Sequence, residues 1–315
     1  MKSVELSVII PVLNEEESLE LLYSKLTSVL ERLDKAYEIL IIDDGSTDRS
    51  FEVLARLHQQ DNRLKVIRFR RNFGQTSAFS AGFDHAQGDI LITLDADLQN
   101  DPEDIPRILE KMSEGHDVVS GWRVDRKEPF FSRRLPSKIV NFLVSRISGV
   151  QLHDYGCSLK AYRSEVMKEV KLYGQMHRFI PAVAGSAGIS VAELPVSHHS
   201  RKHGSSKYGL SRTPVVLLDL VTIGFLLSYS TRPMQIFGRL GLLSFFIGLA
   251  LGIYLVIDKF AFNHGLAERP LLMLAILLVI AGVQLITMGL LGELIVRTYH
   301  EAQNKPTYVI KEIIE

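Results

Sequence analysis

Apolar and polar positions alternate in a regular order over the first 120 residues. Short β-branched runs, such as the one at 7–12, are each followed by a polar turn and then by apolar residues at helical spacing. Strands that alternate with helices predict an α/β domain with a mostly parallel sheet covered on both faces. The expected strands are 7–12, 37–42, 64–69, 89–94 and 117–120, and the expected helices are 19–30, 50–58 and 76–85.

The last third of the chain has a different pattern. No residue is charged in 240–257 or in 270–292, and each run reaches the roughly 18–20 residues that cross a bilayer core. A buried hairpin of a soluble core is the alternative, but core helices of that length rarely lack charge. We therefore expect two transmembrane helices. The apolar stretch 213–227, with Asp219 as its single charge, predicts an interfacial or re-entrant helix before them.

Charge and cysteine content narrow the setting of the chain. Lysine and arginine together number 36, as do aspartate and glutamate, so net charge gives no indication of a nucleic-acid partner. The single cysteine, Cys157, permits no intramolecular disulfide, as expected in a reducing compartment. A basic leader and a cleavable apolar segment are both missing at the N-terminus, and basic residues flank the two runs. These features predict a multi-pass protein of the inner membrane with both termini in the cytoplasm.

One polar cluster follows the fourth expected strand. Asp95, Asp97 and Gln99 are alternate positions that all carry oxygen ligands. Ligands of parallel sheets bind beyond the carboxyl ends of the strands, and Mg²⁺ or Mn²⁺ shares its coordination with substrate phosphates. The cluster therefore indicates a metal-bound diphosphate. The alternative is an acidic turn before a helix that starts at Asp101-Pro102, which is the better interpretation of an isolated Asp-x-Asp.

Two further clusters follow the first two strands. Asn14 with Glu15, and Asp43 with Asp44, are suited to accept hydrogen bonds from ribose hydroxyls and a pyrimidine edge. A helix-capping role is the alternative, strong for Asp48 and weaker for the adjacent aspartates, whose like charges repel without a partner. The sequence has no Gly-x-Gly-x-x-Gly after the first strand and no Gly-x-x-x-x-Gly-Lys-Ser/Thr, which disfavours a Rossmann dinucleotide site and a P-loop.

Together these segments resemble the family 2 inverting glycosyltransferases of the GT-A fold, and within them the polyprenyl-phosphate hexose synthases. The two apolar runs narrow the resemblance to membrane members similar to bactoprenol glucosyltransferases and, more distantly, dolichol-phosphate mannose synthases. A Gln-x-x-Arg-Trp segment is missing, so the chain does not resemble the processive cellulose or chitin synthases. The matching segments are 7–15, 41–48, 71–75, 95–99 and 204–208.

The resemblance and the hydropathy pattern give a domain layout. The basic stretch that begins at Arg123 is followed by apolar residues at helical spacing, which suits either a membrane-surface helix or a solvated helix on the sheet. The expected parts are a cytoplasmic GT-A catalytic domain at 1–210 with a candidate interfacial helix at 131–148, an interfacial helix or linker at 211–232, two transmembrane helices within 233–298 and a cytoplasmic tail at 299–315.

The resemblance also implies a set of site residues. Asp154 lies where the family carries an acid near the sugar, and we expect Asp95, Asp97 and Asp154 at the catalytic centre. The segment 157–160 after it departs from the family pattern, which puts fine contacts there in doubt. The implied nucleotide-sugar contacts are Pro11, Asn14, Glu15, Asp43, Asp44, Ser46, Gln75, Asp95, Arg201 and Lys207; the divalent metal ligands are Asp95, Asp97 and Gln99; the acceptor-phosphate contacts are Arg123, Arg133 and Ser137.

The implied reaction is the inverting transfer of one hexose, with UDP-glucose as the favoured donor, to undecaprenyl or another polyprenyl phosphate in cell-envelope glycosylation. A phosphomonoester is already ionised at neutral pH, so Asp154 is expected to orient a substrate and not to abstract a proton. GDP-mannose and a UDP-aminopentose are alternative donors. A sugar-nucleotide-binding scaffold for a lipid flippase and a lipid-binding structural protein are the non-enzyme alternatives. Small residues in the apolar runs also suit a homo-oligomer.

Overall fold

The computed structural model describes residues 4–124, 141–142, 144–146, 148–169, 176–186, 188–199, 234–262, 270–302 and 308–315. The chain divides into two compact units. The first comprises residues 1–223 together with 306–315, and the second comprises residues 224–305. The candidate interfacial helix at 211–232 and residues 131–140 of the one at 131–148 lie outside the described residues.

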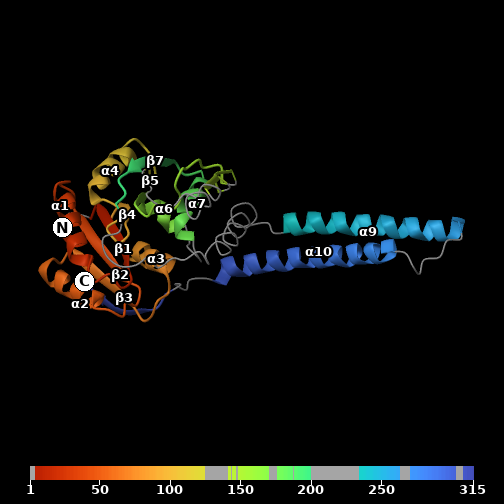
Figure 1. Cartoon of the computed structure of the whole chain (residues 1–315), viewed down its shortest axis with the longest axis horizontal. Helices are drawn as coiled ribbons and strands as arrows, with labels where there is room; N and C mark the ends of the chain where they lie inside the picture. Colours follow the sequence, from red (N-terminus) through yellow and green to blue (C-terminus); the bar gives the residue numbers. More distant parts are fainter. Residues whose placement is uncertain are drawn as a thin grey trace. The chain divides into compact units, whose positions relative to one another are not determined.

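An eight-stranded sheet forms the centre of the first unit (Figure 1). Its order is β7-β5-β6-β4-β1-β2-β3-β8, and β4, β1, β2 and β3 run parallel. The mostly parallel sheet is thus confirmed, with β6 and β8 as antiparallel additions. The strands are β1 Leu6–Val12, β2 Tyr37–Asp43, β3 Leu64–Phe69, β4 Ile90–Thr93, β5 Val118–Arg123, β6 Lys160–Arg163, β7 Val191–Val196 and β8 Ile310–Ile314.

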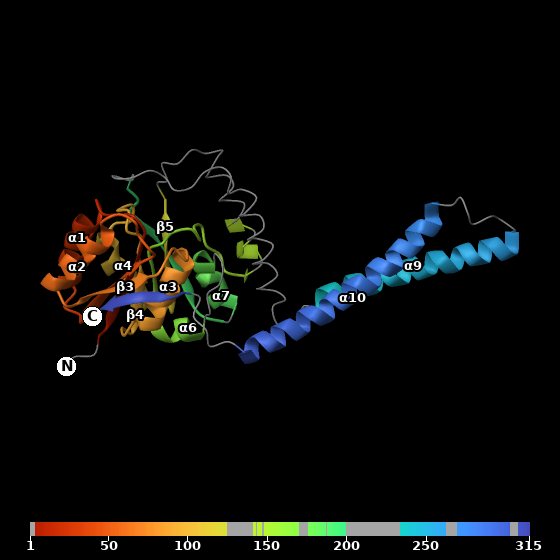
Figure 2. The same cartoon turned by 90° about the horizontal axis from the view of Figure 1, so that it is seen from below.

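Helices cover both faces of this sheet, as Figure 2 shows. One face packs against α1, α2 and α4, and the opposite face packs against α3, α6 and α7. Successive side chains of β1 point to opposite faces of the sheet. Val8 and Ile10 therefore belong to the first hydrophobic core, and Ile9 belongs to the second. The helices are α1 Leu19–Glu31, α2 Ser50–Gln60, α3 Gln75–His85, α4 Ile105–Ser113, α6 Ser164–Glu169 and α7 Ile180–Ser186, with single turns at η1 Pro102–Asp104 and η3 Met176–Arg178.

The buried face of these helices follows the spacing of their apolar residues. Leu19, Leu22, Leu26 and Leu30 of α1 are each at most 1% exposed, and burying each side chain contributes roughly 2 kcal/mol. On the other face, α3 passes so close to β1 that a Cβ on Gly82 would lie 2.2 Å from the Ile9 side chain. Glycine at that position lets α3 settle on the parallel strands, which places its first residue at their carboxyl ends.

The C-terminal residues belong to the same sheet. Tyr308 stacks on Phe69 with ring centroids 5.1 Å apart and donates a hydrogen bond to Asp84 at 2.8 Å. Strand β8 then pairs antiparallel with β3 at the sheet edge (Figure 2). Part of the expected 299–315 tail is therefore an edge strand. Its two charged residues, Lys311 and Glu312, interrupt the apolar run, so the sequence pattern does not indicate a strand here. Charged side chains of this kind suit an exposed sheet edge.

Two long helices form the second unit. They are α9, Met234–Phe262, and α10, Pro270–Ala302, and they lie side by side as a hairpin (Figure 1). Within them, 237–260 and 270–292 are long and apolar enough to cross a membrane, and only 17% and 11% of their most apolar windows are buried. Their apolar side chains are mostly exposed, which is consistent with the expected transmembrane helices and unlike the core of a soluble domain.

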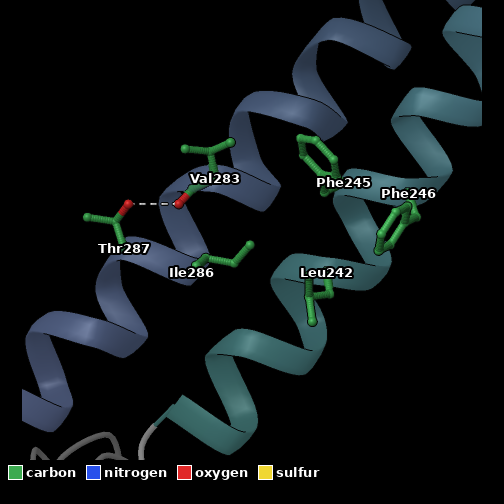
Figure 3. A pocket seen from close by; sticks show the side chains of 6 residues that line it. All are labelled: Leu242, Phe245, Phe246, Val283, Ile286 and Thr287. Carbon is green, nitrogen blue, oxygen red and sulfur yellow. Dashed lines mark hydrogen bonds between the residues drawn. The ribbon is translucent and has the colours of Figure 1, made fainter.

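Glycines bring the two helices together. A Cβ on Gly282 would lie 2.7 Å from the Gly241 carbonyl oxygen, so the backbones touch at this crossing. Beside it lies an apolar groove of about 280 Å³ (Figure 3). The hydroxyl of Thr287 donates to the Val283 carbonyl at 2.9 Å, which satisfies the polar group of the groove within α10. The groove is lined by Leu242, Phe245, Phe246, Val283, Ile286 and Thr287.

Candidate functional site

The loops after β1 and β2 are tied to each other. Asn14 takes a left-handed conformation with φ 53°, and its backbone N–H donates to the Ser46 hydroxyl at 3.0 Å. Its side-chain oxygen accepts from the Thr47 N–H at 2.8 Å, and the Glu15 N–H donates to Ser50 at 2.9 Å. The predicted nucleotide contacts at these two strand ends therefore lie together, next to Pro11 in the register of β1 with β2.

The two adjacent aspartates at the end of β2, Asp43 within the strand and Asp44 just after it, have separate structural partners. Asp43 is fully buried, accepts from the Ser46 N–H at 2.8 Å and lies 3.4 Å from Arg68 Nε. Asp44 accepts from the backbone N–H groups of Phe73 at 2.7 Å and Gly74 at 3.0 Å. Burial raises the pKa of Asp44 to about 6, against the effect of these two hydrogen bonds. Asp44 thus holds the loop that leads into α3.

That loop places Gln75 beside the predicted metal-binding segment 95–99, called the metal motif below. Its side-chain amide donates to Asp95 Oδ1 at 2.8 Å. Burial, and next the negative charge of Asp97, raise the pKa of Asp95 to about 6. Leu98 adopts φ 59°, which is rare for a branched residue, and the Gln99 N–H donates to Asp97 Oδ1 at 3.2 Å. The turn thus keeps the Gln99 backbone against the Asp97 carboxylate, two residues after the Asp95 that Gln75 contacts.

The donor set suits a hard divalent cation. Among the described residues, no group of three His, Cys, Asp or Glu side chains is arranged to hold a metal by itself. Mg²⁺ and Mn²⁺ sites at nucleotides need only one or two carboxylates, because the phosphates complete the coordination shell. Burial, and next the charge of Asp97, raise the pKa of Asp95, and a bound cation would oppose both effects. The residues therefore fit the metal that the sequence predicts.

The chain that follows β7 is fastened to the same motif. The His199 N–H donates to the Gln99 carbonyl at 2.8 Å, and Asn100 forms an isolated bridge with His198. His199 Nε2 lies 2.8 Å from Asp101 Oδ2. Residue 200 follows directly, but Arg201 and Lys207, the predicted diphosphate contacts, lie outside the described residues.

At the carboxyl end of β5, Arg123 pairs with Asp154. Arg123 Nε donates to Asp154 Oδ2 at 2.7 Å and Arg123 Nη2 donates to Oδ1 at 3.0 Å. Asp154 is only 2% exposed and also accepts from the Gly156 N–H at 3.1 Å. The predicted acceptor-phosphate arginine and the predicted acid are thus direct partners. Arg133 and Ser137 lie outside the described residues.

Glu193 on β7 holds the turn that carries Asp154. Its carboxylate accepts from the backbone N–H of Asp154 at 3.0 Å and of His153 at 2.9 Å, and also contacts His153 Nδ1 at 2.8 Å. The His153 ring stacks on Trp122 at 4.2 Å. No sequence pattern indicates this role for Glu193, because it lies 39 residues from Asp154.

The segment that departs from the family pattern has a structural role. Cys157 is buried, and burial raises the pKa of its thiol to about 11. Its sulfur accepts from the Asn100 amide at 3.5 Å, while the Ser158 hydroxyl donates to the Asn100 side-chain oxygen at 2.9 Å. The segment therefore ties the Asp154 loop to the metal motif.

Comparison with known families agrees with this geometry. Residues 7–171 match the model of glycosyl transferase family 2, and residues 232–298 match the GtrB C-terminal hairpin. The chain belongs to glycosyl transferase family 2. The second match covers α9 and most of α10, which supports membrane association of the hairpin.

Full-length relatives are similar along the whole chain. A dodecaprenyl-phosphate galacturonate synthase from Rhizobium johnstonii is 43% identical, over 100% of this chain and 94% of the relative. An undecaprenyl-phosphate 4-deoxy-4-formamido-L-arabinose transferase from Edwardsiella ictaluri is 41% identical, over 98% of this chain and 94% of the relative. The resemblance to polyprenyl-phosphate sugar transferases is thus confirmed.

Solved structures establish the fold of the first unit. Glucosyl-3-phosphoglycerate synthase from Mycobacterium tuberculosis, crystallised with Mn²⁺, UDP-glucose and phosphoglyceric acid, gives a TM-score of 0.55 at 16% identity, covering 70% of this chain and 80% of that chain. Mannosyl-3-phosphoglycerate synthase from Rubrobacter xylanophilus gives 0.55 at 16% identity, covering 70% and 74%. The first unit has the GT-A fold.

Proposed function

We propose that this protein transfers one sugar from a nucleoside diphosphate to the phosphate of a polyprenyl lipid, with inversion at the anomeric carbon. The observation that supports it best is the placement of two unlike groups at the same sheet edge. Asp95 and Asp97 offer carboxylates on one side, and Arg123 offers a guanidinium on the other. Such a pair of sites suits a metal-bound donor and an anionic acceptor.

On the donor side, we assign the nucleotide to the cross-linked loops that contain Asn14, Glu15 and Ser46, beside Pro11. Asp43 and Asp44 already accept backbone hydrogen bonds, so in our proposal they shape the pocket that holds the base. Asp95, Asp97 and Gln99 would hold Mg²⁺ or Mn²⁺, which supplies positive charge for the leaving diphosphate. Gln75 orients Asp95, and Arg201 and Lys207 remain proposed diphosphate contacts.

On the acceptor side, Arg123 neutralises the charge of the lipid phosphate, with Arg133 and Ser137 as further proposed contacts. Asp154 accepts two hydrogen bonds from the guanidinium, so it holds Arg123 in place. The phosphate oxygen is already ionised at neutral pH and needs no strong base. In our proposal Asp154 therefore acts by orientation.

The donor sugar is the finer part of the proposal. UDP-glucose is the donor that the family resemblance favours, and a solved neighbour with the same fold was crystallised with it. The similarity to a galacturonate synthase over the whole chain makes UDP-galacturonate the second candidate, and a 4-formamido-arabinose donor the third. GDP-mannose is the remaining alternative from the sequence.

The topology supports a catalytic unit on one side of the membrane. Strand β8 follows α10 and pairs with β3, so the segments before and after the hairpin belong to one compact unit. Both ends of the hairpin must then open on the same side. We propose that this side is the cytoplasm and that α9 and α10 cross the inner membrane, with a catalytic domain at 1–210, a linker at 211–232, spans within 233–298 and a tail from 299.

The donor is tested by label transfer from a panel of nucleotide sugars to undecaprenyl phosphate, with purified protein in detergent and Mn²⁺ or Mg²⁺ present. The panel contains UDP-glucose, UDP-galacturonate, a UDP-aminopentose and GDP-mannose, and a reaction without lipid is the control. Lipid-dependent transfer of one sugar supports the proposal and names the donor. Nucleotide binding without transfer from any donor would instead favour the flippase scaffold.

A further inference from the structure

A buried lysine lies between the two halves of the site. Lys160 is the first residue of β6 and is only 2% exposed. Its ammonium donates to the Tyr155 carbonyl at 3.0 Å and to the Arg178 carbonyl at 3.1 Å. The first acceptor belongs to the loop that carries Asp154, and the second belongs to η3. A buried charge is costly unless it is fully hydrogen-bonded, so a simple packing role is poorly served by lysine.

The turn η3, which supplies the Arg178 carbonyl, is also held by a contact with α3. His177 is buried, and its Nδ1 lies 2.6 Å from the Thr76 hydroxyl in α3. Gln75, the residue before Thr76, donates a side-chain hydrogen bond to Asp95. The turn at His177 and Arg178 is therefore fixed between the helix that supports the metal motif and the strand that supports the Asp154 loop.

The loop that carries Asp154 and Tyr155 is also held by its own hydrogen bonds. Tyr155 donates its hydroxyl to the Val150 carbonyl at 2.6 Å, and Asp154 beside it is paired with Arg123. A continuous series of contacts thus runs from Asp95 through α3, η3 and Lys160 to the Arg123–Asp154 pair. Lys160 closes this series, because its ammonium is the hydrogen-bond donor shared by the two loops.

We propose that Lys160 is a positioning residue of the transfer reaction, which holds the His177–Arg178 turn against the Asp154 loop and so sets the spacing between donor and acceptor subsites. The inference rests on the proposed transfer reaction. Burial lowers the pKa of Lys160 to about 8, so the group still carries its proton at neutral pH. Misplacement of reacting groups by about 1 Å can cost on the order of 100-fold in rate. The expected defect is therefore in kcat.

The test compares Lys160→Met with Lys65→Met. Both substitutions remove a lysine from a hydrogen-bonded or ionic contact, but Lys65 pairs with Glu38 at 2.9 Å near the amino ends of β2 and β3, away from the site. We expect Lys160→Met to lower kcat by roughly tenfold or more, because the reacting groups are misplaced. Its affinity for UDP should stay within about threefold of wild type. Amide hydrogen exchange should accelerate in 154–159 and 176–180 only in Lys160→Met.

A kcat for Lys160→Met within twofold of wild type, or a loss no larger than that of Lys65→Met, would overturn the inference. If Lys160→Met does not fold, Thr76→Val decides, because it removes the hydroxyl partner of His177 without placing or removing a buried charge. Its kcat is expected to fall while UDP affinity is kept, and an unchanged kcat would overturn the inference. Absence of transfer by the wild-type protein would instead overturn the proposed function itself.

Discussion

Arg123 and Asp154 form a two-point ion pair, with Nε 2.7 Å from Oδ2 and Nη2 3.0 Å from Oδ1. The carboxylate is almost fully buried, while 14% of the arginine side chain is exposed. Planar pairing of this kind fixes the orientation of the guanidinium as well as its charge. The acid expected near the sugar is thus the direct partner of the cation expected at the acceptor phosphate.

Removing one partner of this pair should destabilise the first unit. Asp154→Ala removes the carboxylate that accepts two hydrogen bonds from a guanidinium with little solvent contact, and such a loss costs about 3 kcal/mol of the free energy of unfolding. Denaturant unfolding in detergent measures it. The matched control is Glu103→Ala, whose pair with Arg32 is about 60% exposed on both sides and should cost less than about 1 kcal/mol. Equal losses in both variants would contradict the buried-pair account.

The metal affinity should depend on pH near 6. Burial and the charge of Asp97 raise the pKa of Asp95 to about 6, so the carboxylate is protonated below that pH and ionised above it. A cation competes with the proton, so affinity is kept above pH 6 and lost as the pH falls. We therefore expect Mn²⁺ binding measured by titration calorimetry to be several-fold weaker at pH 5.5 than at pH 7. An affinity that is equal at the two pH values would argue against Asp95 as a ligand.

Asp44 should act on the donor pocket through the loop before α3. Asp44→Ala leaves the N–H groups of Phe73 and Gly74 without their acceptor, at a cost of about 1–3 kcal/mol. The loop also passes Gly45 closely, since a Cβ there would lie 2.5 Å from the Arg71 backbone. We expect weaker UDP binding and faster hydrogen exchange over 71–75. UDP affinity and exchange equal to those of the wild type would show that Asp44 does not hold this loop.

The helix hairpin should depend on the contact between Gly241 and Gly282. In Gly282→Leu, the Cβ would meet the Gly241 carbonyl oxygen and the Phe245 backbone nitrogen, both at 2.7 Å, and neither atom belongs to a flexible side chain. We expect a lower melting temperature in detergent. Gly252→Leu is the control, because nothing lies within 4 Å of a Cβ at that position. Similar melting temperatures for the two variants would contradict the close packing of α9 and α10.

The sequence predicts the repeated features of this molecule better than its long-range contacts. The alternation of strands and helices defines the parallel core, and polar residues after β1, β2 and β4 do gather at one sheet edge. The antiparallel strands β6 and β8 were not expected, because they are short and β8 carries two charges.

Contacts between residues distant in the chain account for what the pattern could not show. Arg123 pairs with a residue 31 positions away, Glu193 holds a turn 39 positions away, and Thr76 meets His177 across 101 positions. Single side chains of this kind leave no periodic signal. Only the folded structure shows that Lys160, His177 and Glu193 contact the segments that carry predicted site residues.

The most direct test of the account is metal-dependent transfer of labelled sugar to undecaprenyl phosphate by the wild-type protein and by Asp97→Ala. The account predicts transfer that requires Mn²⁺ or Mg²⁺ and falls by on the order of 100-fold or more in the variant, because a ligand of the diphosphate-bound metal is lost. UDP-sugar binding without metal should persist in both proteins. Full transfer by Asp97→Ala, or transfer by the wild type in excess chelator, would contradict the account.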